Sequence, residues 1–186
     1  MWTIITIVGV LLACLILIYN SFASLRNRAK NAWADIDVQL KRRHDLVPNL
    51  VATVQGYAAH EKAVFEDVAR LRAQATQAGD VNGKGGAEEE LSGAIRSLFA
   101  VAESYPDLRA DQNFRDLQRQ LTEIEDHIQY ARRYYNAVVR DMNTKCETFP
   151  SNLVGGWFGF TRLPYFQAND DDREPVQVGP KEQEGQ

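Results

Sequence analysis

The sequence predicts an all-α protein in which an N-terminal transmembrane helix continues into an antiparallel four-helix bundle with long, coiled-coil-like helices. Three observations lead to this fold class. The run from Trp2 to Tyr19 contains no charged side chain. Beyond it, apolar residues recur at alternating spacings of three and four, the period of one face of a helix. No stretch of useful length alternates apolar and polar residues as a strand would.

The first predicted element is a membrane anchor over residues 1–19. As a helix rising 1.5 Å per residue, the run from Trp2 to Tyr19 is about 27 Å long, close to a hydrocarbon thickness of about 30 Å. Trp2 and Tyr19 stand at its two ends, where such aromatic residues favour the membrane interface. The side chains expected to form the anchor are Trp2, Ile4, Ile5, Ile7, Val8, Leu11, Leu12, Leu15, Ile16, Leu17, Ile18 and Tyr19.

Two other interpretations of this run are weaker. A cleaved signal peptide has a basic start and a shorter apolar core, whereas nothing basic precedes Trp2 except the amino terminus, although Ser21-Phe22-Ala23 resembles a cleavage site. The residues from Leu11 to Cys14 resemble a lipoprotein signal, but the apolar run continues after Cys14. The prediction is therefore an uncleaved single-pass anchor.

The charges beside the anchor predict its orientation. No lysine or arginine precedes the apolar run, while Arg26, Arg28 and Lys30 follow it closely. Positive residues favour the cytoplasmic side of a membrane. We therefore expect the short N-terminus outside and the bundle in the cytoplasm.

The first helix is expected to continue out of the membrane, because no glycine or proline interrupts the chain from Val10 to Val47. It is expected to end near His44. The stretch Lys41 to Val51, KRRHDLVPNLV, then predicts a corner between two antiparallel helices. Pro48 suits the first turn of a helix and disfavours helical geometry at the residue before it. The basic residues here would lie about 30 Å from the membrane, beyond a Debye length of about 8 Å, which disfavours lipid binding and leaves an acidic partner protein open.

Two further helices are predicted between this corner and the middle of the chain, one from about Pro48 to Ala78 and one from Ala87 to about Ser104. Gly79 would stop the former, and Gly79 to Gly86 is predicted to be a flexible loop. Glu61 is the one charged position on an otherwise apolar seam. We expect it at the edge of the stripe or opposite an arginine.

The fourth helix has the clearest pattern, because its apolar positions alternate three and four without a miss from Phe114 to Met142. Asp107 or Asp111 is expected to cap its start, and Phe149-Pro150 to close it. Four amphipathic helices with short connections bury their stripes against one another in a bundle. That predicted bundle covers residues 20–149.

A C-terminal segment rich in aromatic residues and glycine follows over residues 150–168 and contains NLVGGWFGF. Its large apolar side chains, Trp157, Phe158 and Phe160, form the candidate interaction site. We expect the segment to fold back onto the bundle, or else to dock on a partner protomer or a membrane surface. The acidic tail over residues 169–186 is predicted to be disordered.

No catalytic, cofactor-binding or metal-binding residues are predicted. The histidines are His44, His60 and His127, which we expect at solvated helix positions; HEKAV lacks the second histidine of a zinc protease, and no Glu-x-x-His pair supports a di-iron bundle. The sequence has no Gly-rich phosphate loop and no nucleophile elbow. A net charge of −4 disfavours nucleic acid, even though Arg132 and Arg133 adjoin two tyrosines.

Several stretches together resemble the LemA family of bacterial membrane proteins. They are YNSF after the apolar run, RNRAKNAWADIDVQLKRRHDLVPNLVATVQGYAAHEKAVFEDV, ESYPDLRADQNFRDLQRQLTEIEDHIQYARRYYNAVVRDMNT, ETFPSNLVGGWFGF and YF. The similarity covers Tyr19 to Phe166, and DVQLKRRHDLVPNLV and YPDLRA are its most specific phrases. Met142 and Cys146 depart from the family pattern, where we expect tyrosine and an aliphatic residue, which bears on packing.

The resemblance implies a LemA-type bundle in the bacterial inner (cell) membrane and implies no enzymatic reaction or cofactor. A relative among the magnetosome proteins implies a role in membrane organisation, and family members encoded near membrane metalloproteases and TPM-domain proteins imply shared quality-control work. We therefore expect a non-enzymatic scaffold that self-assembles to organise the membrane or its proteins, or alternatively an adaptor or regulator of a membrane protease. The expected partners are the lipid bilayer, further copies of the chain in a homo-oligomer, and a membrane protease or TPM-domain protein, without nucleic acid.

Overall fold

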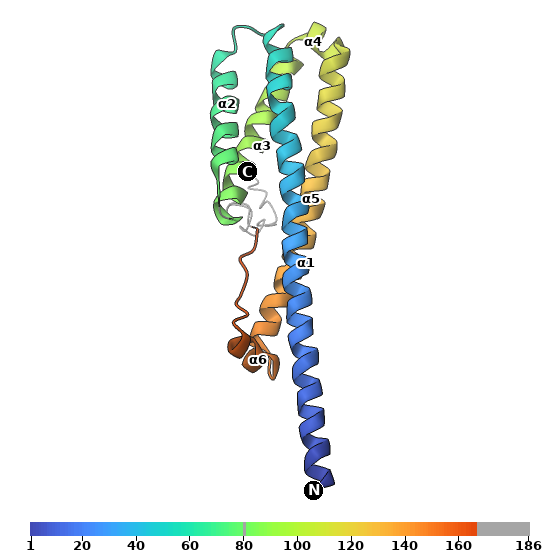
Figure 1. Ribbon diagram of the computed structural model, residues 1–186. Coiled ribbons are helices and arrows are strands. Elements are labelled where there is room, and N and C mark those ends of the chain that lie inside the picture. The colour runs from blue at the N-terminus through green and yellow to red at the C-terminus, as the bar shows by residue number, and fades with distance from the viewer. Residues whose placement is uncertain (80, 167–186) are drawn as a thin grey trace, which may run out of the picture.

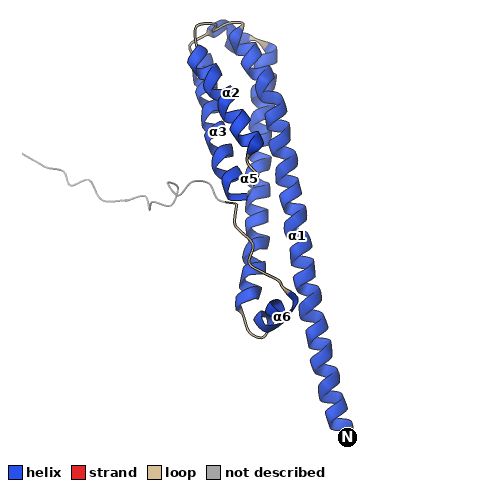
Figure 2. Ribbon diagram, turned by 60° about the vertical axis from the view of Figure 1, so that its left-hand side comes forward, coloured by secondary structure: helices blue, strands red, loops and turns tan. Residues whose placement is uncertain are grey.

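The computed structural model describes residues 1–79 and 81–166, and these residues form helices and no strand (Figures 1 and 2). This confirms the predicted all-α class. The predicted disordered tail, residues 169–186, lies outside the described residues. The helices are α1 (Trp2–Gln55), α2 (Lys62–Gln77), α3 (Val81–Glu103), α4 (Pro106–Ala110), α5 (Gln112–Glu147) and α6 (Ser151–Phe158).

Four long helices pack as the predicted antiparallel bundle, with α5 running back along α1, and α2 and α3 paired beside them (Figure 1). Two apolar clusters hold it together. One joins the C-terminal third of α1 to α2, α3, α4 and the start of α5. The other joins the middle of α1 to α5 through Ile36, Leu40, Ile128 and Val139. The N-terminal part of α1 extends alone beyond the bundle (Figures 1 and 2).

The predicted corner at Lys41 to Val51 is wrong, because α1 continues through it to Gln55 with Pro48 inside the helix. A proline within a helix leaves the carbonyl four residues earlier without its backbone donor. Here that carbonyl belongs to His44, and Arg72 Nε on α2 donates a hydrogen bond to it at 2.7 Å. A side chain from a neighbouring helix therefore supplies the donor that Pro48 lacks.

The chain reverses at residues 56–61 instead, so the predicted helix from Pro48 to Ala78 is divided between α1 and α2. The turn is held by backbone bonds from the amides of Tyr57 and Ala58 to the carbonyl of Val54, at 3.0 and 2.9 Å. Glu61 lies half-buried at the N-cap of α2, before the helix rather than inside its seam.

The predicted flexible loop from Gly79 to Gly86 is wrong from Val81 onward, because α3 begins there rather than at Ala87. Glycines are poor helix formers, so tertiary contacts must hold this turn. The Lys84 ammonium pairs with the Asp37 carboxylate of α1 and lies 5.9 Å from the centre of the Trp33 ring. Packing against α1 thus extends a helix that local propensity does not favour.

The prediction for α5 is confirmed. Asp111 is its N-cap and accepts a hydrogen bond from the Phe114 amide at 2.9 Å, while its other oxygen accepts one from the Tyr57 hydroxyl at 3.0 Å. The helix ends at Glu147, just before Phe149-Pro150. The apolar seam from Phe114 to Met142 faces the core, fully buried at most positions.

Candidate functional site

The apolar start of α1 is the one helix in the described residues that is long and apolar enough to cross a membrane. None of its apolar window is buried against the rest of the chain. The residues predicted to form the anchor lie all around this helix, and only Leu15 and Ile18 among them are partly covered. Such a continuous apolar surface is costly in water, so it is the surface expected of a helix that faces lipid.

Helix α6 packs against α1 where this apolar run ends. The Phe158 ring lies edge-on to Tyr19 with ring centres 4.9 Å apart, and the Phe160 ring stacks on Phe22 at 4.8 Å. Gly155 makes this approach possible, because a Cβ there would lie 3.2 Å from Phe22 Cζ. Gly159, with φ 71°, ends α6 in the left-handed conformation that glycine adopts without strain.

The side of α6 opposite Gly155 carries Leu153 and Trp157, which are four residues apart and so lie on one helix face, and Phe149 is exposed in the turn just before the helix. Phe149, Leu153 and Trp157 are 80%, 58% and 82% exposed. We call these three residues the foot surface. Of the predicted interaction residues, the structure brings Phe158 and Phe160 together with Tyr19 and leaves Trp157 outward. Phe149 and Leu153 were not among the predicted interaction residues, although the spacing of four between Leu153 and Trp157 could have revealed Leu153.

After α6 an extended segment returns along α5, held by two asparagine side chains. Asn143 donates to the Leu163 carbonyl at 3.0 Å and accepts from the Leu163 amide at 2.8 Å. Asn136, two helical turns earlier, makes the same pair of bonds with Phe166, at 3.0 and 2.8 Å. Each asparagine thus satisfies both backbone groups of one residue, as a neighbouring strand would. This clamp fixes the connection from α6 to the bundle.

A buried polar cluster of Arg43, His44, Glu88 and Ser92 crosses the middle of the bundle, whereas the sequence predicted a solvated position for His44. That prediction is wrong. Arg43 is 2% exposed and donates to Glu125 Oε2 at 2.8 Å, to the Glu88 carbonyl at 3.2 Å, and to Ser92 Oγ and the Glu88 carboxylate. His44 Nε2 lies 2.8 Å from Glu88 Oε1. Buried charges are tolerated when paired in this way.

Electrostatics keep the Glu88 carboxylate ionised. Burial raises the pKa of Glu88, but the hydrogen bond with His44 and the positive charge of Arg43 lower it by more, so the pKa lies below the usual glutamate value. The cluster is therefore an ion-paired contact between α1 and α3, with α5 contributing Glu125.

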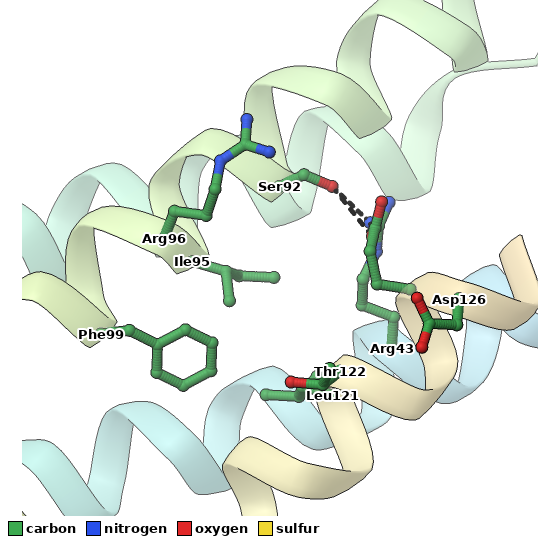
Figure 3. Close-up of a pocket in the computed structure, with 9 residues that line it drawn as sticks. Arg43, Ser92, Ile95, Arg96, Phe99, Leu121, Thr122 and Asp126 are labelled. Atoms are coloured by element: carbon green, nitrogen blue, oxygen red, sulfur yellow. Dashed lines mark hydrogen bonds and ion pairs between the residues drawn. The ribbon is translucent and has the colours of Figure 1, made fainter. Parts of the chain in front are cut away.

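A pocket of about 220 Å³ opens beside this cluster between α1, α3 and α5 (Figure 3). Its apolar wall comes from α3 and α5, and the side chain of Ser92 points toward Arg43. The Arg43 charge in the pocket is already neutralised by Glu88 and Glu125. The pocket residues are Arg43, Ser92, Ile95, Arg96, Phe99, Leu121, Thr122, Glu125 and Asp126.

The three histidines lie in different settings. His44 is buried in the cluster, His60 is exposed in the turn after α1, and His127 is exposed on α5. In the described part of the chain, no group of three or more His, Cys, Asp or Glu side chains could hold a metal ion.

The fold defines a class of protein: a bundle of long helices whose first helix begins as a membrane-type apolar segment. Comparison with known proteins gives the family. The LemA family model matches residues 32–179, so the chain belongs to the LemA family. The resemblance noted in the sequence is thereby confirmed.

Named relatives are distant. The chain is 26% identical over 191 residues to the magnetosome proteins MamQ 1 and MamQ 2 of Paramagnetospirillum magneticum, covering 89% of this chain and 70% of each relative. It is 25% identical over 162 residues to the protein LemA of Metamycoplasma hominis, covering 84% of this chain and 72% of the relative.

Proposed function

We propose that this protein is a non-enzymatic scaffold of the bacterial inner membrane, whose copies assemble side by side to organise the membrane or its proteins. One observation carries the proposal: α1 runs without a break from the apolar start at Trp2 into the core of the bundle, ending at Gln55. The anchor and the bundle therefore share one helix and no flexible linker. Such a protein holds its surface at a fixed height and direction above the bilayer, which suits assembly.

The dimensions of the rod support this role. From Asn20 to Gln55, α1 rises about 54 Å at 1.5 Å per residue, so the bundle projects well beyond the headgroups. The hydrogen bond from Arg72 to His44 keeps the helix continuous at Pro48, its one internal proline. A hinge there would uncouple the two ends.

The charges next to the anchor support a cytoplasmic bundle. Arg26, Arg28 and Lys30 are all exposed on the first three turns beyond Asn20. Positive residues in this place favour retention on the cytoplasmic side, which leaves the short N-terminus outside.

The family supports membrane organisation over chemistry. The relatives named as magnetosome proteins agree with the role that the family resemblance implies. At the pocket in Figure 3, Arg43 is paired with Glu125 and with the neighbouring Glu88, as in a structural cluster.

The test is crosslinking in native membranes, followed by affinity purification of the full chain and measurement of complex size. We expect a ladder of crosslinks between copies of this chain. A single discrete complex with a membrane protease, without crosslinks between copies, would overturn the scaffold and favour the adaptor. Cysteines introduced at exposed Arg28 and at Ala63 test the orientation, because both should resist an impermeant thiol reagent in intact cells.

A further inference from the structure

We propose that the foot surface, Phe149, Leu153 and Trp157, is inserted in the cytoplasmic interface of the same bilayer that the anchor spans. This inference rests on the membrane anchoring in the proposed function and adds a second contact with lipid. It commits the outward face of α6 to a lipid surface rather than to another copy of the chain.

The first argument is depth. Tyr19 is the last residue of the apolar run, and its ring lies 4.9 Å from Phe158 and 5.6 Å from Phe160, centre to centre. In both views α6 lies beside α1 at the lower end of the bundle, where α1 begins to extend alone (Figures 1 and 2). An anchor that spans the hydrocarbon places Tyr19 at the interface. Helix α6 is then at the level of the headgroups.

The second argument is continuity of the apolar surface. The inner face of α6 buries Val154 and Gly155, the latter against Phe22, while the foot surface points outward. Where α6 meets α1, Phe158 and Tyr19 are themselves 49% and 39% exposed, and the exposed side chains of the anchor, such as Leu17, follow along α1. One apolar surface thus runs from the proposed membrane span onto α6.

The third argument is charge. A polar groove beside α6, shared with α1 and α5, is lined by Arg28 and Lys145, with Asp141 as its acidic member. Arg162, just after α6, is exposed and pairs with Glu147 at 3.1 Å. Basic side chains next to a face with tryptophan and leucine are typical of helices that lie in the membrane interface and attract anionic headgroups.

The fourth argument is area, which disfavours a second copy as the occupant. A stable protein interface buries about 800 Å² on each partner. Large aromatic side chains bury about 150–250 Å² each, and Leu153 is smaller and only 58% exposed, so the three side chains together present less than this. Insertion into lipid needs no complementary partner face.

The test is fluorescence quenching of the full-length protein in vesicles of phosphatidylcholine and phosphatidylglycerol. Three variants each contain a single tryptophan, and every other native tryptophan is changed to phenylalanine. The first keeps Trp157, the second keeps Trp2 as the anchor reporter, and the third carries Tyr130→Trp as a reporter on α5. Tyr130 is an exposed aromatic residue about 22 Å further along α5 than Lys145, which contacts Ser21 near the anchor. Circular dichroism checks that each variant keeps its helices.

We expect shallow-brominated phosphatidylcholine to remove most of the Trp157 emission, and aqueous iodide to affect it several-fold less than the Tyr130→Trp reporter. Iodide quenching of Trp157 equal to that of the α5 reporter overturns the inference. Protection of Trp157 from both quenchers that disappears when the protein is diluted into excess lipid identifies a second copy as the occupant, and also overturns it.

The Trp2 variant separates this inference from the proposed function. If brominated lipid quenches Trp2 but not Trp157, the anchor spans the bilayer and the foot surface lies outside it, so the inference alone fails. If it quenches neither tryptophan, membrane anchoring itself fails.

Discussion

The Nε atom of Arg72 donates a 2.7 Å hydrogen bond to the carbonyl oxygen of His44, the acceptor that Pro48 leaves without a backbone donor in α1. A contact between two helices therefore completes the hydrogen bonding of one of them. Its consequence is a continuous rod, and the rod is the feature on which the scaffold proposal rests.

Removing this donor should destabilise the bundle. We expect Arg72→Ala to lower the free energy of unfolding by about 1–3 kcal/mol, because a half-buried carbonyl loses its partner. Guanidinium denaturation in mild detergent, followed by circular dichroism, measures it. Arg70→Ala is the matched control, since Arg70 is exposed and pairs only within α2; its effect should stay within about 0.5 kcal/mol.

Restoring the backbone donor should remove most of that loss. Pro48→Ala supplies an amide that can bond to the His44 carbonyl, so Arg72→Ala should cost clearly less in the Pro48→Ala background than in the wild type. A double-mutant cycle on the same denaturation curves gives the coupling. Strict additivity of the two changes would contradict the role assigned to Arg72.

The buried cluster should be sensitive to loss of its cation. Arg43→Ala leaves Glu88 buried without its charge partner, and we expect a cost of about 3–5 kcal/mol in unfolding free energy. Arg42→Ala, at the exposed neighbouring position, should change it by no more than about 0.5 kcal/mol. Equal effects from the two changes would show that Arg43 is not held as described.

Glu88 should make stability fall in acid. Its pKa is lower in the folded chain than in the unfolded one, so its carboxylate stabilises the fold fully above the unfolded-state value of about 4.3. This stabilisation is lost as the pH falls from there through the folded-state pKa. Denaturation midpoints measured across that window should fall less steeply in Glu88→Gln than in the wild type, whereas exposed Glu90→Gln should keep the wild-type slope.

The two glycines of α6 should respond differently to a methyl group. Gly155→Ala places a Cβ 3.2 Å from Phe22, which is fully buried beneath the Phe160 ring, whereas a Cβ at Gly156 meets nothing within 4 Å. We expect Gly155→Ala to loosen α6 and Gly156→Ala to leave it intact or stabilise it slightly. Hydrogen exchange of the α6 amides measures the difference; faster exchange in Gly156→Ala alone would reverse the assignment of faces.

The asparagine clamp gives a local readout of the segment after α6. In Asn143→Ala the Leu163 amide loses its acceptor, and in Asn136→Ala the Phe166 amide does. Each amide should exchange several-fold faster with solvent in its own variant. Exposed Asn113→Ala, at the far end of α5, should change neither amide.

Elements whose signals are local could be predicted from the sequence. The seam of α5, its cap at Asp111 and its end before Phe149-Pro150 all depend on residues within a few positions of one another. The corner at Pro48 was mispredicted because the residue that makes a helix possible there, Arg72, lies 28 positions after His44, whose carbonyl it bonds. In the same way, Lys84 extends α3 toward its start through a contact with Asp37 on another helix.

The candidate sites divide along the same line. Composition alone identified the apolar run and the aromatic residues after the bundle. It could not reveal that Arg43 is buried, because its partners Glu88 and Glu125 follow 45 and 82 positions later. Nor could it show that Phe158 faces Tyr19 while Trp157 faces away, since that depends on how α6 meets α1.

Because α1 is unbroken, the rotation of the bundle about the helix axis is also fixed relative to its anchor. Each residue of a helix turns the chain by about 100°. Inserting two alanines after Asn20 would rotate the bundle by about 200° about the helix axis relative to Leu17 in the anchor. Inserting four would rotate it by about 400°, which nearly restores the original orientation. Neighbouring copies that meet through one side of the rod would then tolerate length changes here only in steps of roughly a full turn.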